Sequence, residues 1–151
     1  MNQPVVKFLA SGAFLGYIPL APGTLGTLWG IPVFYGLSGF SPAIQAVASV
    51  LFILAAVFLS GRAALAWGRK DPPRVVIDET AGYLASTCWL PFTGLTVLGG
   101  FVIFRILDIF KPFPIRKIDR ELKGGWGIVL DDVLAGIFTN ILLRLVMAFT
   151  G

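Results

Sequence analysis

The stretch TAGYLASTCWLPFTGLTVLGGFVIF, residues 80–104, decides how this chain folds, because it carries no charge and is interrupted by Pro91 and Gly94. A helix needs about 20 mostly apolar residues to cross a bilayer. The stretch is therefore either one crossing or a hairpin of two shorter helices that turn at residues 91–94. One crossing would place the flanking polar loops in different compartments, whereas a hairpin would bring them together.

The composition indicates an integral membrane protein. Of the 151 residues, 56% are hydrophobic and only 13% are charged, whereas about a quarter of a soluble domain is charged. A second uncharged run extends from Phe8 to Gly61. We therefore expect a single all-α domain, residues 1–151, that passes through the membrane several times.

The distribution of charge favours the hairpin. The turns expected at residues 38–42 and 91–94 carry no charge, and basic residues accumulate in cytoplasmic loops. With the hairpin, one side receives most of the basic residues: Lys7, Arg69, Lys70, Arg74, Lys111, Arg116, Lys117, Arg120 and Lys123. We predict about five short, tilted or re-entrant segments with these loops in the cytoplasm and the C-terminus outside. Contact with anionic lipid explains the net charge of +4 better than nucleic acid does.

The segments follow from this topology. An apolar, interfacial segment is expected over residues 1–17, followed by a loop at 18–28 because that stretch holds two prolines and two glycines. Helices are expected over residues 25–37, 43–67 and 128–149, in addition to the two arms of the hairpin. Residues 68–74 and 115–123 are predicted to be polar and basic loops.

The residue types exclude several chemistries. The chain has no histidine, which excludes a Ser–His triad and histidine-dependent lipid phosphatases. A cysteine phosphatase needs an arginine six residues after its nucleophile, but Gly94 occupies that position after Cys88. Metal-assisted chemistry by carboxylates remains.

Five acids lie at the predicted segment ends: Asp78, Glu79, Asp108, Asp131 and Asp132. Ionisable residues at membrane depth are costly and usually functional. Oxygen ligands of this kind suit Mg²⁺, which is commonly held by one or two carboxylates together with substrate phosphate. The alternative is structural: Asp108 would pair with Arg105, three residues away, and the other acids would be interfacial caps.

Phosphate-binding groups accompany these acids. The predicted loop contains Pro22, Gly23, Thr24, Gly26 and Thr27, which can offer backbone N–H groups and hydroxyls near a helix N-terminus. The alternative is an ordinary turn. Arg105 and Lys111 can bind phosphate oxygens.

Four segments together resemble the phosphatidylglycerophosphatase A family, bacterial Mg²⁺-dependent lipid phosphatases: Gly16–Leu28, Val76–Tyr83, Phe104–Pro114 and Gly124–Gly136. The resemblance implies hydrolysis of phosphatidylglycerophosphate to phosphatidylglycerol and phosphate at the bacterial inner membrane. The alternatives are another lipid-phosphate phosphatase or transferase. A small cation carrier is disfavoured, because the acids lie at segment ends.

Each site residue receives a hypothetical role. The metal ligands would be Asp78, Glu79, Asp131 and Asp132, with Glu79 and Asp132 essential for catalysis. Asp108 would position or deprotonate the attacking water. Arg105 and Lys111 would neutralise the phosphate.

Overall fold

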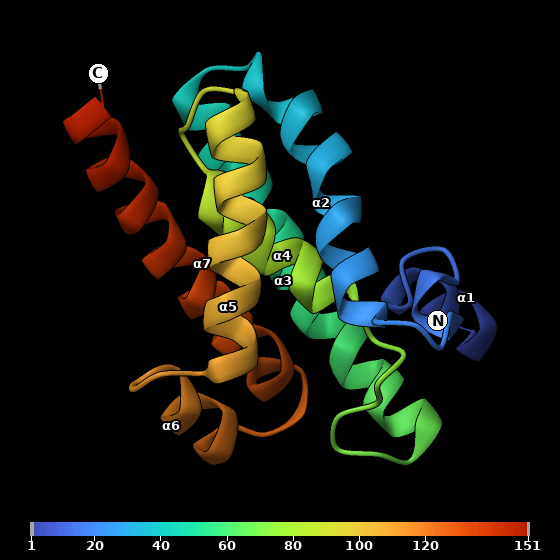
Figure 1. The fold of residues 1–151 in the computed structure, drawn as a ribbon. Helices are drawn as coiled ribbons and strands as arrows, with labels where there is room; N and C mark the ends of the chain where they lie inside the picture. The colour runs from blue at the N-terminus through green and yellow to red at the C-terminus, as the bar shows by residue number, and fades with distance from the viewer. Residues whose placement is uncertain (1, 151) are drawn as a thin grey trace.

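The computed structural model describes residues 2–150, and this part of the chain is helical without a β-strand. The elements, in order, are α1 (Gln3–Ala10), η1 (Leu15–Tyr17), α2 (Pro22–Ser38), α3 (Pro42–Trp67), α4 (Ile77–Thr87), the π-helical η2 (Leu95–Gly99), α5 (Gly100–Phe110), α6 (Ile115–Glu121) and α7 (Gly124–Thr150). Figure 1 shows α2, α3, α5 and α7 as long rods around α4, with α6 beneath α5 and α1 at the side.

The hairpin predicted for residues 80–104 is confirmed. Helix α4 ends at Thr87, and the chain returns through η2 and α5. Thr96 fixes the turn, since its hydroxyl donates to the Pro91 carbonyl at 2.5 Å and accepts from the Thr93 N–H at 3.0 Å. The loop before α4 and the segment after α5 consequently lie at one end of the bundle and line one pocket.

Helix α4 is the centre of the bundle and packs against α2, α3, α5 and α7. Glycines permit this close packing. A Cβ at Gly30 of α2 would lie 2.6 Å from the Tyr83 ring, and one at Gly82 would lie 2.7 Å from the Asp132 carbonyl oxygen. On α7, a Cβ at Gly136 would overlap the Gly82 carbonyl oxygen. The backbones of α4 and α7 therefore touch directly, which sets the height at which their side chains meet.

Two predicted loops contain helix. Residues 22–28 form the first turns of α2 and are not a loop, because Pro22 occupies the first turn, where a missing N–H costs nothing. No side chain caps this helix, whose N-cap residue is Ala21. Residues 115–121 of the predicted basic loop form α6. The helices predicted over residues 25–37, 43–67 and 128–149 are present, and each begins earlier than predicted.

Two helices are long and apolar enough to cross a membrane: α3 over its whole length and residues 124–149 of α7. Only 28% of the most apolar window of each is buried within the protein. Large apolar side chains on the other helices are also exposed, among them Trp29, Tyr35, Leu98, Val102 and Ile106. Soluble proteins rarely expose apolar surface on this scale, so these helices indicate membrane association.

Candidate functional site

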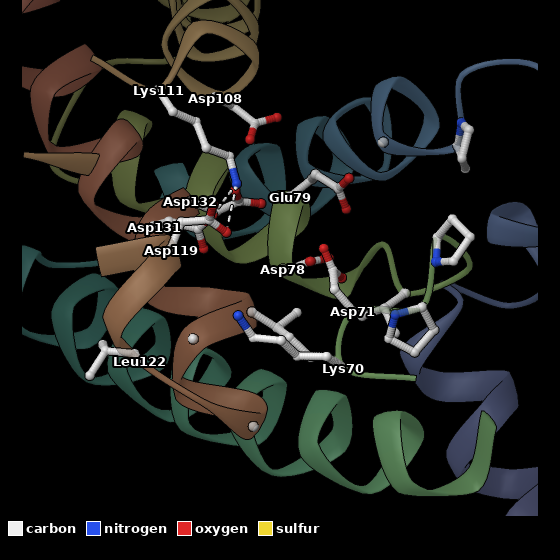
Figure 2. Close-up of a pocket in the computed structure, with 18 of the residues that line it drawn as sticks. Lys70, Asp71, Asp78, Glu79, Asp108, Lys111, Asp119, Leu122, Asp131 and Asp132 are labelled. Atoms are coloured by element: carbon white, nitrogen blue, oxygen red, sulfur yellow. Dashed lines mark hydrogen bonds and ion pairs between the residues drawn. The ribbon is translucent and has the colours of Figure 1, made fainter. Parts of the chain in front are cut away.

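A polar pocket of about 320 Å³ opens at the end of the bundle where α2, α4 and α7 begin and α5 ends. Figure 2 shows acidic side chains converging on it from α4, α5, α6 and α7, with Lys70 and Asp71 approaching from the loop after α3. Three helix N-termini face this space, and helix N-termini favour bound anions. The pocket therefore combines carboxylates with groups suited to phosphate.

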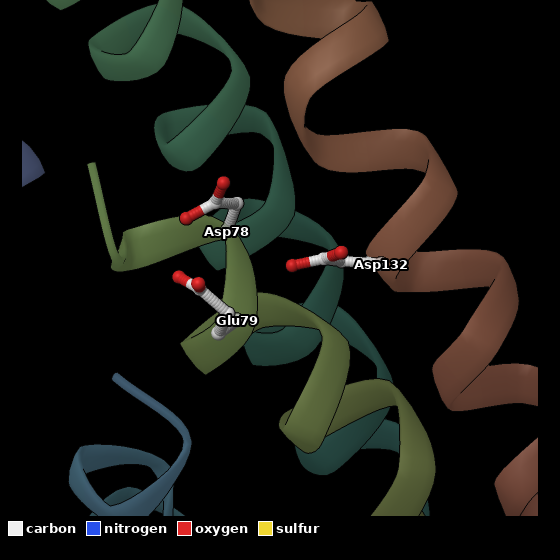
Figure 3. A group of neighbouring side chains, drawn as sticks. All are labelled: Asp78, Glu79 and Asp132. Carbon is white, nitrogen blue, oxygen red and sulfur yellow. The ribbon is translucent and has the colours of Figure 1, made fainter. Parts of the chain in front are cut away.

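Three carboxylates gather at its base. Asp78 and Glu79 come from the first turn of α4, and Asp132 reaches them from α7 (Figure 3). One oxygen from each lies within 4.8 Å of the others. Asp78 Oδ1 and Glu79 Oε2 are buried and have no hydrogen-bond partner among the described residues. A buried, unpartnered carboxylate oxygen is costly unless a cation or water occupies its lone pairs.

Lys111 connects the two sides of the pocket. Its Nζ lies 2.5 Å from Asp131 Oδ2 and 3.2 Å from Asp119 Oδ1. Burial alone would lower the pKa of Lys111, but its hydrogen bond and ion pairs with these carboxylates outweigh that effect and raise the pKa above the ordinary value. Lys111 therefore remains a cation. Asp131 binds it through Oδ2, whereas Asp131 Oδ1 has no partner among residues 2–150.

Arg105 and Asp108 lie on the last turns of α5 and form an ion pair of 2.5 Å. This is the contact expected from the structural alternative, yet both side chains also line the pocket. The buried Nε of Arg105 has no partner within the described chain. A Cβ at Gly23 would lie 3.1 Å from both terminal nitrogens of Arg105 and would overlap Glu79 Oε1. Gly23 thus lets the guanidinium and the carboxylate approach the start of α2.

The residues predicted to bind phosphate on α2 divide into two groups. Pro22 and Gly23 line the pocket, whereas Thr24, Gly26 and Thr27 are not among its lining residues. The Thr27 hydroxyl is buried and donates to the Gly23 carbonyl at 2.9 Å. Gly26 faces α4, where its carbonyl accepts from the Thr80 hydroxyl at 2.8 Å.

Sequence reasoning missed three charged residues that line the pocket: Lys70, Asp71 and Asp119. Lys70 and Asp71 lie in the loop after α3 and Asp119 lies on α6, two segments that the hairpin brings together, so the hairpin itself was the signal that could have identified them. With them included, seven carboxylates and three cationic side chains face the pocket. This excess of negative charge would repel a phosphate anion unless further cations enter.

Comparison with known proteins identifies the family. The model of the phosphatidylglycerophosphatase A family matches residues 8–147. This chain belongs to the phosphatidylglycerophosphatase A family. The resemblance found in the sequence is thereby confirmed.

This chain matches most of the length of several curated relatives. Phosphatidylglycerophosphatase A of Escherichia coli (strain K12) is 39% identical over 132 residues, covering 87% of this chain and 77% of the relative. The protein of the same name from Haemophilus influenzae is 36% identical, and the match covers 91% of this chain and 86% of the relative. A putative phosphatidylinositol-3-phosphatase of Bacteroides thetaiotaomicron is 35% identical, covering 89% of each chain. No solved structure matches this chain.

In this member of the phosphatidylglycerophosphatase A family, the donor set fits a metal ion. Asp78, Glu79 and Asp132 supply oxygen atoms alone, their side chains are largely buried, and two of those oxygens have no protein partner among residues 2–150. Hard divalent cations take such ligands. Asp131 lies beside this group but is paired with Lys111, so its predicted role as a metal ligand has less direct support than the other three.

Proposed function

We propose that this chain hydrolyses phosphatidylglycerophosphate to phosphatidylglycerol and phosphate, with Mg²⁺, at the cytoplasmic face of a bacterial inner membrane. The observation that carries the proposal is the group of Asp78, Glu79 and Asp132, whose oxygens lie within 4.8 Å of one another beside Arg105 and Lys111. An acidic cluster that also holds cations suits a metal ion and a phosphate monoester together. Membership of the family supports the substrate.

The metal would be held by Asp78, Glu79 and Asp132, with Asp131 available through its second oxygen. When bound, it would supply charge neutralisation and polarisation of the phosphate oxygens. The protein's own cations complete this work: Arg105 and Lys111 bind the remaining phosphate oxygens, and the backbone at Gly23 presents the N-terminus of α2 to them.

Asp108 is the residue we assign to the attacking water. It lies in the same pocket, and its ion pair with Arg105 fixes the carboxylate in one orientation. A carboxylate held in this way accepts a hydrogen bond from water and orients the oxygen toward the phosphorus. Arg105 consequently has two tasks, which are holding Asp108 and binding phosphate.

The membrane arrangement is part of the proposal. We infer about five short or tilted segments, with the pocket in the cytoplasm and the turns at residues 38–42 and 91–94 on the opposite side. The absence of charge in both turns and the basic loops around the pocket support this orientation. Single cysteines placed at Asp71 and Glu121 in a Cys88→Ser background should react with the same impermeant reagent from the same side; labelling from opposite sides would contradict the topology.

A second substrate is a phosphoinositide carrying a phosphate monoester on its ring. The observation in its favour is the 35% identity with a putative phosphatidylinositol-3-phosphatase. Both lipids present a monoester to the same pocket, so the carboxylates alone do not distinguish them.

Phosphate release from purified protein tests the proposal. We expect release from phosphatidylglycerophosphate with Mg²⁺, its loss with EDTA, and slower release from phosphatidylinositol 3-phosphate. Asp132→Asn and Glu79→Gln should lower the rate at least about 100-fold. Glu121→Gln removes an exposed carboxylate outside the pocket and should not. Turnover unaffected by EDTA and by both pocket variants would refute the assigned site, and faster release from the phosphoinositide would reverse the choice of substrate.

A further inference from the structure

A second cavity adjoins the pocket and is apolar. It has a volume of about 860 Å³ and lies between α3 and the beginning of α7. Leu54, Phe58 and Leu65 of α3 and Trp126 of α7 form its walls, and all four are about half exposed or more. We call this cavity the α3–α7 groove.

The groove is continuous with the polar pocket. Lys70 and Gly124 line both spaces. The two helices touch at Gly61 and Gly125, where a Cβ on Gly125 would overlap the Val57 carbonyl oxygen. This backbone contact forms the floor of the groove, and the larger apolar side chains around it remain about half exposed or more.

Cations line the part of the groove nearest the pocket: Arg69 and Lys70 follow the end of α3, and Arg62 lies about two turns earlier, on that helix. Arg62, Arg69 and Lys70 all line the groove. None of their side chains has an ion-pair or hydrogen-bond partner within residues 2–150, unlike Arg105 and Lys111 in the pocket. Three unpaired cations beside an apolar surface match an anion attached to a hydrocarbon chain.

We propose that the α3–α7 groove binds the diacylglycerol end of the substrate lipid and that Arg62, Arg69 and Lys70 bind its phosphodiester. The proposal rests on the proposed function, because that substrate carries two phosphates with different chemistry. The terminal monoester enters the acidic pocket, where the proposed metal ion would offset the repulsion by the carboxylates, and the diester remains at the cationic edge. The glycerol between the two phosphates passes Lys70 and Gly124.

The length of the groove suits an acyl chain. From Leu54 to Gly68, both of which line it, α3 rises about 21 Å. One leaflet of the hydrocarbon core is about 15 Å deep, half of the usual thickness of about 30 Å. The groove thus covers the acyl depth of one leaflet and reaches the head-group level at its cationic end. It also explains how the enzyme would select a lipid over soluble phosphate monoesters that share the reacting group.

Kinetics with three substrates test the groove. Phosphatidylglycerophosphate carries chains, diester and monoester; its deacylated form lacks the chains; glycerol 3-phosphate carries only the monoester. Leu54→Trp should lower the ratio of kcat/KM for the diacyl over the deacylated substrate about tenfold, mainly through KM. Leu51→Trp is the matched control, since Leu51 lies on α3, is 61% exposed and does not line the groove.

The cationic edge is tested separately. Arg62→Gln should lower the ratio of kcat/KM for the deacylated diester over glycerol 3-phosphate about tenfold, whereas Arg120→Gln, on α6, should leave that ratio unchanged. If Leu54→Trp and Leu51→Trp give the same ratio of kcat/KM, and Arg62→Gln gives the same ratio as Arg120→Gln, the proposed role of the groove in binding lipid is refuted. The phosphatase activity would be unaffected by that result.

A binding measurement keeps this test independent of turnover. An anionic phospholipid with a photoreactive acyl chain should cross-link chiefly to peptides covering residues 54–65 and 124–126. Cross-links spread over α2 and α5 would overturn the proposal. If the wild-type chain releases no phosphate from phosphatidylglycerophosphate, the proposed function fails, and the cross-linking map still decides whether the groove binds lipid.

Discussion

Replacing Lys111 with methionine would separate the structural role of this residue from its role in phosphate binding. Lys111 Nζ lies 2.5 Å from Asp131 Oδ2, and the Asp131 side chain is only 4% exposed. Methionine keeps most of the aliphatic stem of lysine but removes the charge. The carboxylate of Asp131 would then be left buried without its counter-ion.

The size of the effect follows from burial. Removing one partner of a buried ion pair costs about 3–5 kcal/mol, because the remaining charge loses its compensation. For a chain of this length, that corresponds to a fall in Tm of about 6–20 °C, taking about 2–4 °C per kcal/mol. Lys117→Met is the matched control, since Lys117 lies 3.9 Å from Glu121 and both side chains are more than half exposed. Such exposed pairs contribute about 0–1 kcal/mol.

The contribution of the Lys111 proton to stability follows from the direction of its pKa shift. The ion pairs raise the pKa of Lys111, so the folded state holds this proton more tightly than the unfolded state does. Stability from a raised pKa is fully present below the unfolded value of about 10.5 and is lost only above it. The titration of Lys111 itself therefore adds no pH dependence to the difference in Tm between wild type and Lys111→Met from about pH 7 to pH 9.

The assay combines thermal unfolding in detergent with phosphate release. Lys111→Met should lose both stability and activity, and Lys111→Met with Asp131→Asn should recover most of the stability, because the unpaired charge is gone. If Lys111 also binds phosphate, activity stays low in the double variant. A Lys111→Met protein whose Tm falls no more than that of Lys117→Met would refute the reasoning about the buried pair.

Three further substitutions have expected outcomes. Gly23→Ala should lower phosphate release about 10–100-fold with little change in Tm, because the new Cβ would displace Glu79 and Arg105 in the pocket, and near-normal turnover would contradict this packing. Thr27→Val should cost about 1 kcal/mol by removing the bond to the Gly23 carbonyl, and it should retain activity; a selective loss of turnover would show that the hydroxyl binds substrate after all. Phe104→Ala should cost about 3–5 kcal/mol, measured as Tm, since the ring is fully buried against Gly82, and a smaller fall would mean that the helices collapse into the cavity.

The sequence predicted the parts of this fold that depend on hydropathy and charge. The break at Pro91 and Gly94 and the uncharged turns were sufficient to derive the hairpin. The same topology brought Asp78, Glu79 and Asp132 to one end of the bundle, where the structure places them. Patterns of this kind are visible in sequence because the membrane imposes them on whole segments.

Interactions that depend on side-chain packing were not predictable in the same way. Pro22 and the glycines after it indicated a loop, yet they begin α2, because those glycines pack against Val76 and Glu79 rather than turning the chain. The bond between Lys111 and Asp131 joins residues 20 positions apart and has no periodic signal. Asp71, in the loop after α3, and Asp119, on α6, line the pocket only because the hairpin brings these two segments together.

Helix α4 shows why the acids can lie within so apolar a chain. It spans only Ile77–Thr87, and most of its residues are buried, whereas α3 and α7 expose their apolar faces. The surrounding helices therefore shield α4 from lipid, and its polar side chains bond to backbone carbonyls, as Thr80 does to Gly26. Asp78 and Glu79 occupy its first turn, where the helix dipole favours negative charge. The cost of burying these carboxylates is thus offset by the protein around them and by the cation that we propose they hold.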